Sequence, residues 1–145
     1  MITTNTVRIA APAEDVWTVF ADVERWPTWT PSVTSVRSLD GPLAVGARFE
    51  IRQPRLPRLV WEVVEFDAGR SWVWRAGAAG GRTFAHHVVE AQDDGTTLVT
   101  QRIDQRGVSV LFGLFTRGLT RRYLAQEADG LKAACERRPH GAPQP

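Results

Sequence analysis

The chain has 145 residues, of which 43% are hydrophobic and 23% are charged, and its formal net charge at pH 7 is +2. These values are ordinary for a globular protein, and no apolar run approaches the ~20 residues that span a bilayer. The arginines are scattered instead of forming one block, which gives no support for a nucleic-acid surface. We expect one domain over residues 1–137 and a disordered tail over 138–145, where proline, glycine and polar residues dominate.

The N-terminus and the cysteine content indicate the compartment. The first residues contain neither the basic stretch nor the apolar stretch of a secretory signal, so we expect a cytoplasmic protein. Cys135 has no second cysteine with which to form an internal disulfide. Its place on a helix face favours a core position over a nucleophilic role.

The first third of the chain predicts a strand and two short helices. Residues 2–10 include an alternation of apolar and polar side chains that is typical of a strand. Pro12 suits the first turn of a helix that should end before Pro27, with one extra turn over 22–26. The segment 26–31 contains two tryptophans and two prolines, and it predicts an ordered corner.

The middle of the chain predicts a meander of further strands. Apolar and β-branched stretches alternate with short turns rich in glycine, proline and aspartate, and connections this short favour antiparallel neighbours. The first strand can join this meander at one edge, which gives a curved seven-stranded antiparallel sheet. The predicted strands of the meander are 33–39, 47–53, 59–66, 71–76, 82–91 and 96–105.

The segment 108–137 contains no proline and predicts one long helix. At ~1.5 Å per residue the helix would be roughly 40 Å long, so it must cross the molecule and the sheet must wrap it. Its apolar face changes direction near Gly118, which predicts a bend there or an aromatic first half that lines a cavity. The first apolar stripe contains Val108, Phe112, Phe115, Leu119 and Tyr123, and the second contains Leu124, Ala128, Leu131 and Cys135.

This order of elements is that of the α+β helix-grip fold, and the sequence resembles the START-like, pollen-allergen-like superfamily (SRPBCC), most closely its polyketide cyclase/dehydrase branch. The resemblance implies a cavity between the sheet and the long helix for an apolar or aromatic molecule that is polyketide-, lipid- or quinone-like. Members of the superfamily have diverse functions, so the fold alone does not choose among them. The blocks that carry the resemblance are 12–17 (PAEDVW), 22–29 (DVERWPTW), 41–49 (GPLAVGARF), 63–67 (VVEFD) and 95–100 (GTTLVT).

The tryptophans are the main candidates for ligand contacts, and the chain has six of them. Trp72 and Trp74 share one face of a predicted strand and Trp61 lies on the preceding strand, so they could form a wall on which a flat ligand stacks. The alternative is plain core packing. The predicted ligand-binding residues are Trp61, Trp72, Trp74, Val89, Phe112, Phe115, Leu119 and Tyr123.

The candidates for catalysis lie on the last two predicted strands. His86 and His87 are adjacent and point to opposite faces, and the phase usual in the resembled family puts His87 and Val89 inside. An inward His87 could serve as a general acid or base. Arg102 could hold a carboxylate or enolate, and Asp104 could abstract a proton beside a carbonyl. The alternative for these polar residues is a position on the solvent faces of the strands.

These features favour a domain that binds a small apolar or aromatic molecule. The alternatives are a polyketide cyclase/dehydratase-type enzyme and a protein-interaction or sensor module, the latter marked by a large exposed apolar patch. The sequence contains no phosphate-binding loop, metal-ligand set or nucleophile elbow, so we expect no cofactor, no metal and no nucleic-acid partner. The oligomeric state stays open between a monomer and a homodimer.

Overall fold

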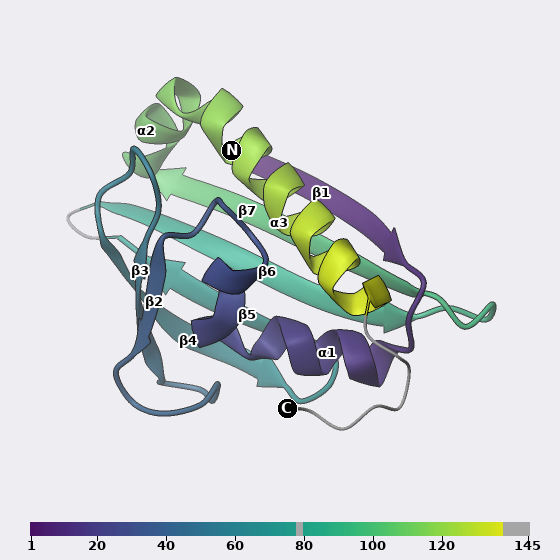
Figure 1. The fold of residues 1–145 in the computed structure, drawn as a ribbon. Coiled ribbons are helices and arrows are strands. Elements are labelled where there is room, and N and C mark those ends of the chain that lie inside the picture. The colour runs from purple at the N-terminus through teal and green to yellow at the C-terminus, as the bar shows by residue number, and fades with distance from the viewer. Residues whose placement is uncertain (78–79, 138–145) are drawn as a thin grey trace.

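The computed structural model describes residues 1–77 and 80–137. The tail expected over 138–145 therefore lies outside the described residues. The strands form one antiparallel seven-stranded sheet in the order β1-β7-β6-β5-β4-β3-β2, with β1 at one edge as predicted (Figure 1). Their bounds are β1 Ile2–Ile9, β2 Ser35–Ser38, β3 Arg48–Arg52, β4 Leu59–Asp67, β5 Ser71–Ala76, β6 Gly81–Ala91 and β7 Thr97–Gly107.

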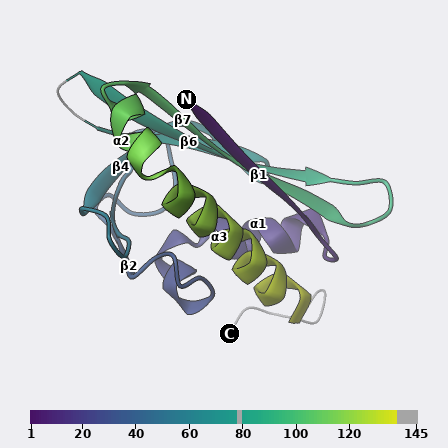
Figure 2. The same ribbon diagram turned by 90° about the horizontal axis from the view of Figure 1, so that it is seen from above.

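The helices cover one face of this sheet, so the molecule has two layers (Figure 2). The long helix α3 crosses the sheet on the same side as α1, as the predicted helix-grip fold requires (Figure 1). Gly130 permits close packing of α3, because a Cβ atom there would overlap the backbone carbonyl of Trp29. The helices are α1 Ala13–Ala21, the 3₁₀ helix η1 Val23–Thr28, α2 Ser109–Phe115 and α3 Arg117–Arg137.

The two short helices after β1 follow the predicted pattern with one difference. Pro12 immediately precedes α1, and its carbonyl accepts the first backbone hydrogen bonds of the helix. The helix α1 ends before Pro27 as predicted, but η1 continues through Pro27 to Thr28. The indole Nε1–H of Trp26 donates a 2.8 Å hydrogen bond to the carbonyl of Phe20, which fixes η1 against the end of α1.

The prediction of one continuous helix over 108–137 is wrong, because the helical segment begins at Ser109 and is interrupted at Thr116. The Thr116 hydroxyl donates a 2.9 Å hydrogen bond to the carbonyl of Phe112, which also accepts the backbone N–H of Thr116. The backbone of Thr116 departs from helical geometry, with φ −105° and ψ 12°, and here α2 ends and α3 begins. The break lies two residues before Gly118, where the bend was expected.

The second apolar stripe of the predicted helix is confirmed, since all its members on α3 are buried. The core between the two layers is strongly aromatic, and the ring of Trp72 at its centre has no exposed surface. Trp72 contacts the rings of Trp17, Phe20 and Trp74, with centroids 4.9–5.8 Å apart. The exposed fractions of the stripe are Leu124 4%, Ala128 5%, Leu131 1% and Cys135 2%.

Candidate functional site

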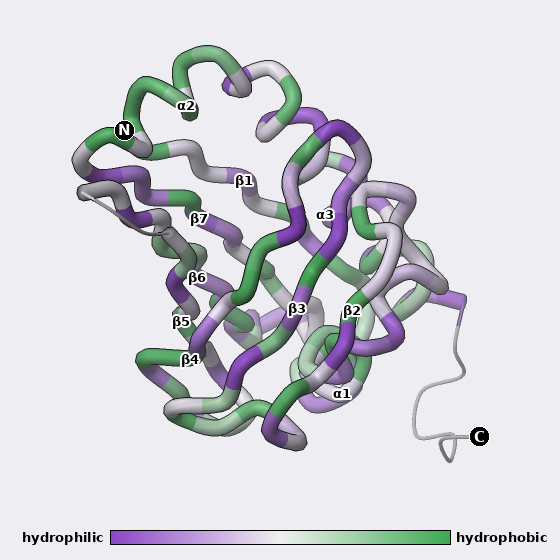
Figure 3. The backbone as a smooth tube through the Cα atoms, turned by 90° about the vertical axis from the view of Figure 1, so that its left-hand side faces the viewer, coloured by the Kyte–Doolittle hydropathy of each residue, from purple (hydrophilic) through white to green (hydrophobic). Residues whose placement is uncertain are grey.

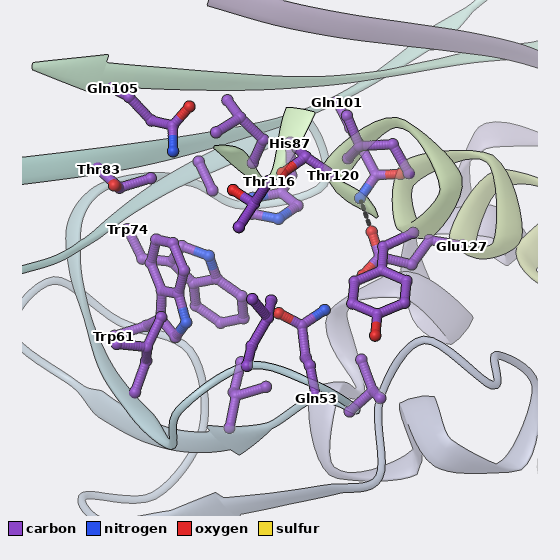
Figure 4. Close-up of a pocket in the computed structure, with 18 of the residues that line it drawn as sticks. Gln53, Trp61, Trp74, Thr83, His87, Gln101, Gln105, Thr116, Thr120 and Glu127 are labelled. Carbon is purple, nitrogen blue, oxygen red and sulfur yellow. Dashed lines mark hydrogen bonds between the residues drawn. The ribbon is translucent and has the colours of Figure 1, made fainter. Parts of the chain in front are cut away.

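A pocket of about 120 Å³ lies between the concave face of the sheet and the helices α2 and α3 (Figure 4). The connection between β3 and β4, residues 53–58, closes it on the third side. Sites for drug-sized ligands span about 300–1,000 Å³, whereas a cavity of about 150 Å³ holds benzene. The pocket therefore matches a ligand of about one ring.

One wall of the pocket is aromatic, and it is formed by Trp26 on η1, Trp61 on β4 and Trp74 on β5. The centroid of the Trp74 ring lies 5.9 Å from that of Trp61 and 5.8 Å from that of Trp26. All three side chains are at least nine-tenths buried. Trp26, which sequence analysis assigned to an ordered corner, thus also belongs to the pocket.

The wall formed by β6 and β7 carries amides, a hydroxyl and an imidazole around the apolar side chains of Ala85 and Ile103. Strand alternation and the pairing of His87 with Gln101 place Thr83, His87, Gln101 and Gln105 on the same face (Figure 4). The Oε1 atom of Gln105 is buried and accepts no hydrogen bond from the described part of the chain. The amide of Gln105 fits beneath Gly113, where a Cβ atom would overlap it. This wall can form hydrogen bonds with a ligand.

Glu127 on α3 is the buried carboxyl group of the pocket, with only 7% of its surface exposed. Its Oε1 accepts a 3.2 Å hydrogen bond from the hydroxyl of Ser32, and its Oε2 accepts a 3.0 Å bond from Nε2 of Gln101. Burial raises the pKa of Glu127 to about 7, although these two hydrogen bonds oppose the rise. Glu127 can therefore gain or lose a proton near neutral pH.

Sequence analysis missed Glu127, although the sequence contains a signal for it. Residues three and four apart on a helix share a face. Glu127 follows Leu124 by three positions and precedes Leu131 by four, so it lies on the second apolar stripe. A charged residue within an otherwise apolar stripe must find partners in the interior, and here Ser32 and Gln101 provide them.

His87 faces the pocket, as the family phase implied, and it is 3% exposed. Its ring stacks on Trp72 at 4.2 Å between centroids with a 9° interplanar angle, and its Nδ1 lies 3.3 Å from the Trp72 carbonyl. Burial lowers the pKa of His87 to about 3, against the opposing effect of that hydrogen bond. The imidazole is therefore neutral near pH 7, and its pKa is poorly matched to proton transfer there.

Arg102 and Asp104 do not face the pocket, so the prediction that they could is corrected. They alternate with Gln101 and Gln105 along β7, and it is the glutamines that line the pocket. On the outer face, Asp104 forms ion pairs with Arg106 at 2.9 Å and Arg102 at 3.8 Å. The hydrogen bond from Arg106 lowers the pKa of Asp104, which keeps its carboxylate ionised. Their observed role is therefore in an ion-pair cluster on the opposite side of the sheet.

The predicted ligand-binding residues divide into two groups. Trp61, Trp74, Phe112 and Tyr123 line the pocket. The hydroxyl of Tyr123 donates to the carbonyl of Pro54, which attaches the β3–β4 connection to α3.

The other four predicted contacts, Trp72, Val89, Phe115 and Leu119, do not line the pocket. Trp72 and Val89 are core residues, 0% and 4% exposed. Phe115 is 90% exposed and Leu119 is half-buried. The side chains of α2 and α3 that line the pocket follow one helical stripe, which contains Phe112, Thr116, Thr120, Tyr123 and Glu127 but neither Phe115 nor Leu119.

The helix α2 consists mostly of hydrophobic residues, which are green in Figure 3, and several of their side chains are exposed. Leu111, Leu114 and Phe115 are 62%, 57% and 90% exposed, and Phe112 both lines the pocket and is 48% exposed.

Within residues 1–77 and 80–137 no three His, Cys, Asp or Glu side chains could together hold a metal ion. No described helix has the length and apolar character needed to cross a membrane.

A family model described as "Polyketide cyclase / dehydrase and lipid transport" matches residues 2–136. The chain belongs to this family. The match confirms the resemblance seen in the sequence blocks, and the helix-grip order of elements agrees with it. No curated protein matches the sequence.

Solved structures support the same fold for this polyketide cyclase/dehydrase family member. A hypothetical protein from Helicobacter pylori has a TM-score of 0.81 at 18% identity, over 93% of this chain and 88% of that one. A START superfamily protein from Mycobacterium smegmatis has a TM-score of 0.75 at 16% identity, over 93% and 97% of the two chains. Norcoclaurine synthase from Thalictrum flavum, in complex with dopamine and hydroxybenzaldehyde, has a TM-score of 0.70 at 16% identity, over 96% and 88%. Identities this low establish the fold alone.

Proposed function

We propose that this protein binds a small aromatic molecule of about one ring in the pocket between the sheet and α3. The observation that carries the proposal is the composition of the walls, with Trp26, Trp61 and Trp74 on one side and hydrogen-bonding side chains on the other. Indole faces bind flat rings with little loss of conformational entropy. The size and lining of the pocket thus support binding of a planar ligand with a polar edge.

The polar edge of the ligand can meet the side chains of Thr83, Gln101 and Gln105, which line the pocket. The Oε1 atom of Gln105 is buried beneath Gly113, so it is the amide Nε2 group that could donate to a ligand oxygen. The ligands of the norcoclaurine synthase structure, dopamine and hydroxybenzaldehyde, are also one-ring compounds with hydroxyl groups.

Thr120→Phe is expected to weaken binding by at least about tenfold, because Thr120 lines the pocket and a phenyl group there would occupy ligand space. Binding is measured by tryptophan fluorescence in titrations with phenol and hydroxybenzaldehyde. Arg121→Phe is the matched control, since it adds the same ring at the next, exposed position of α3. Equal affinities for the two variants, or no saturable quenching by any compound, would argue against this pocket as the binding site.

A cyclase- or dehydratase-type enzyme is the second candidate, and Glu127 is the observation that favours it. A general acid or base works best when its pKa lies near the working pH, and burial brings the pKa of Glu127 to about 7. Glu127 would then move the proton that the sequence analysis assigned to His87 or Asp104. A bound ketone whose α-hydrogens exchange with solvent no faster in the wild type than in Glu127→Gln would exclude this role.

A further inference from the structure

We propose that the pocket selects a cationic ligand, an arylalkylamine whose ammonium group pairs with the carboxylate of Glu127. This inference rests on the proposed function of the same pocket and specifies the class of ligand. It depends on three features of the described residues, namely the charge of the pocket, the faces of its aromatic wall and the surroundings of Glu127.

The charge of the pocket is opposite to that of the whole chain. The sequence contains 18 Lys and Arg against 16 Asp and Glu, yet no described residue that lines the pocket is Lys, Arg or Asp. Glu127 is the acid among them. A pocket for a carboxylate or phosphate would need a basic side chain or several free donors, whereas this pocket offers a carboxyl group.

The aromatic wall suits the ring of such a ligand. Aromatic rings attract one another in offset-stacked and edge-to-face arrangements. Trp26, Trp61 and Trp74 lie close enough together to form one continuous wall. A ligand held between this wall and Glu127 could present its ring to the indoles and its ammonium group to the carboxylate (Figure 4).

Glu127 has hydrogen-bond partners but no cationic partner in the described part of the chain. Ser32, before β2, and Gln101 on β7 hold its two oxygens, and both are uncharged. The titratable groups that share the pocket are His87 and His86 on β6 and Tyr123 on α3. Burial lowers the pKa of both histidines, so they are mainly neutral near pH 7. The hydroxyl of Tyr123 donates to the carbonyl of Pro54.

Burying the unpaired charge of an ionised Glu127 costs free energy, and the charge of the ligand decides whether this cost is offset. An ionised carboxylate in an apolar interior is stable only when it is paired, and a ligand ammonium group would supply the missing partner. An uncharged ligand would leave Glu127 free to keep its proton. A carboxylate ligand would place a second acid beside Glu127 and would be rejected.

The test compares three one-ring ligands that differ in their polar group: phenethylamine, phenethyl alcohol and phenylacetate. Affinities are measured by isothermal titration calorimetry at about pH 6 and about pH 8, where this amine stays protonated. Because the pKa of Glu127 is about 7, its ionised fraction rises from about a tenth to about nine tenths between these conditions. The affinity for phenethylamine is expected to rise about tenfold with pH, and that for the alcohol should stay within about twofold.

Glu127→Gln and Asp129→Asn are the matched variants. Both remove one carboxylate from α3, but Asp129 is exposed and is not part of the pocket. At about pH 8, Glu127→Gln is expected to weaken phenethylamine binding about tenfold and to leave phenethyl alcohol within about twofold. Asp129→Asn should change neither affinity.

The outcomes separate this inference from the proposed function. Tighter binding of phenethylamine that depends on pH and on Glu127 supports both. Saturable binding of the alcohol with no preference for the amine, or a preference for phenylacetate, overturns the cationic ligand but retains the pocket as a binding site. A preference for the amine that survives in Glu127→Gln also overturns it. The absence of binding by all three compounds overturns both proposals.

Discussion

Glu127→Gln is expected to stabilise the fold by about 3 kcal/mol at about pH 8. The pKa of Glu127 is raised from 4.5 to about 7 in the folded state, so between these values the folded chain keeps a proton that the unfolded chain has lost. The contribution of this group to stability is therefore full below about pH 4.5 and is lost as the pH rises to about 7. At about 1.4 kcal/mol per pH unit, a window of about 2.5 units gives about 3 kcal/mol. Glutamine carries no charge and should avoid this loss.

The measurement is urea unfolding of the wild type and the variant at several pH values. Their difference should be below about 1 kcal/mol near pH 5 and should grow to about 3 kcal/mol near pH 8. His87 contributes an opposite slope, since its lowered pKa destabilises the fold as the pH falls from 6.5 to about 3. That slope is common to both proteins and cancels in the difference. A benefit of Glu127→Gln that is the same at every pH, or that Asp129→Asn reproduces, would contradict the buried titration.

Trp72→Ala is expected to destabilise the fold by about 3–5 kcal/mol, the usual cost of truncating a large buried aromatic residue. Trp72 has no exposed surface, and its ring contacts the rings of Phe20, Trp74 and His87 at centroid distances of 4.9, 5.8 and 4.2 Å. The void would open behind the pocket and would release the stacked imidazole of His87. Urea unfolding at one pH measures the loss.

Trp72→Phe is the control for this prediction, because it keeps a ring in the same place and leaves a smaller void. We expect it to cost less than Trp72→Ala and to preserve ligand affinity, since Trp72 does not line the pocket. If Trp72→Ala left the stability nearly unchanged but abolished ligand binding, Trp72 would be a ligand contact, as first predicted from the sequence. Its side chain would then contribute little to the stability of the core.

Much of the fold could be predicted from the sequence because local patterns and the family blocks agree. Short turns between alternating stretches indicate antiparallel neighbours, and β5 has the predicted bounds Ser71–Ala76. The break at Thr116 could not be predicted, because threonine is tolerated within helices, as Thr18 is in α1, and only the backbone angles of Thr116 in the folded chain show the interruption. Gly118 carried the more obvious signal but lies inside α3.

The site was harder to predict because β7 carries polar residues on both faces. The inward phase had a signal that sequence analysis did not use, since Val99 and Ile103 share the face of Gln101 and Gln105 while the other face carries charged side chains. Glu127 was missed for a different reason. Its role depends on Ser32 and Gln101, which are distant in the sequence and meet it only in the folded chain.

The central claim is that the pocket walled by Trp61 and Trp74 binds the ligand, and NMR of the indole N–H groups tests it most directly. The signals can be assigned with Trp61→Phe and Trp74→Phe, and phenol can serve as the probe. The account predicts that the signals of Trp61 and Trp74 shift with saturation at one ligand per chain. The signal of Trp17, which packs on Phe66 and Trp72 outside the pocket, should shift far less. Unchanged Trp61 and Trp74 signals, or a larger shift at Trp17, would contradict the claim.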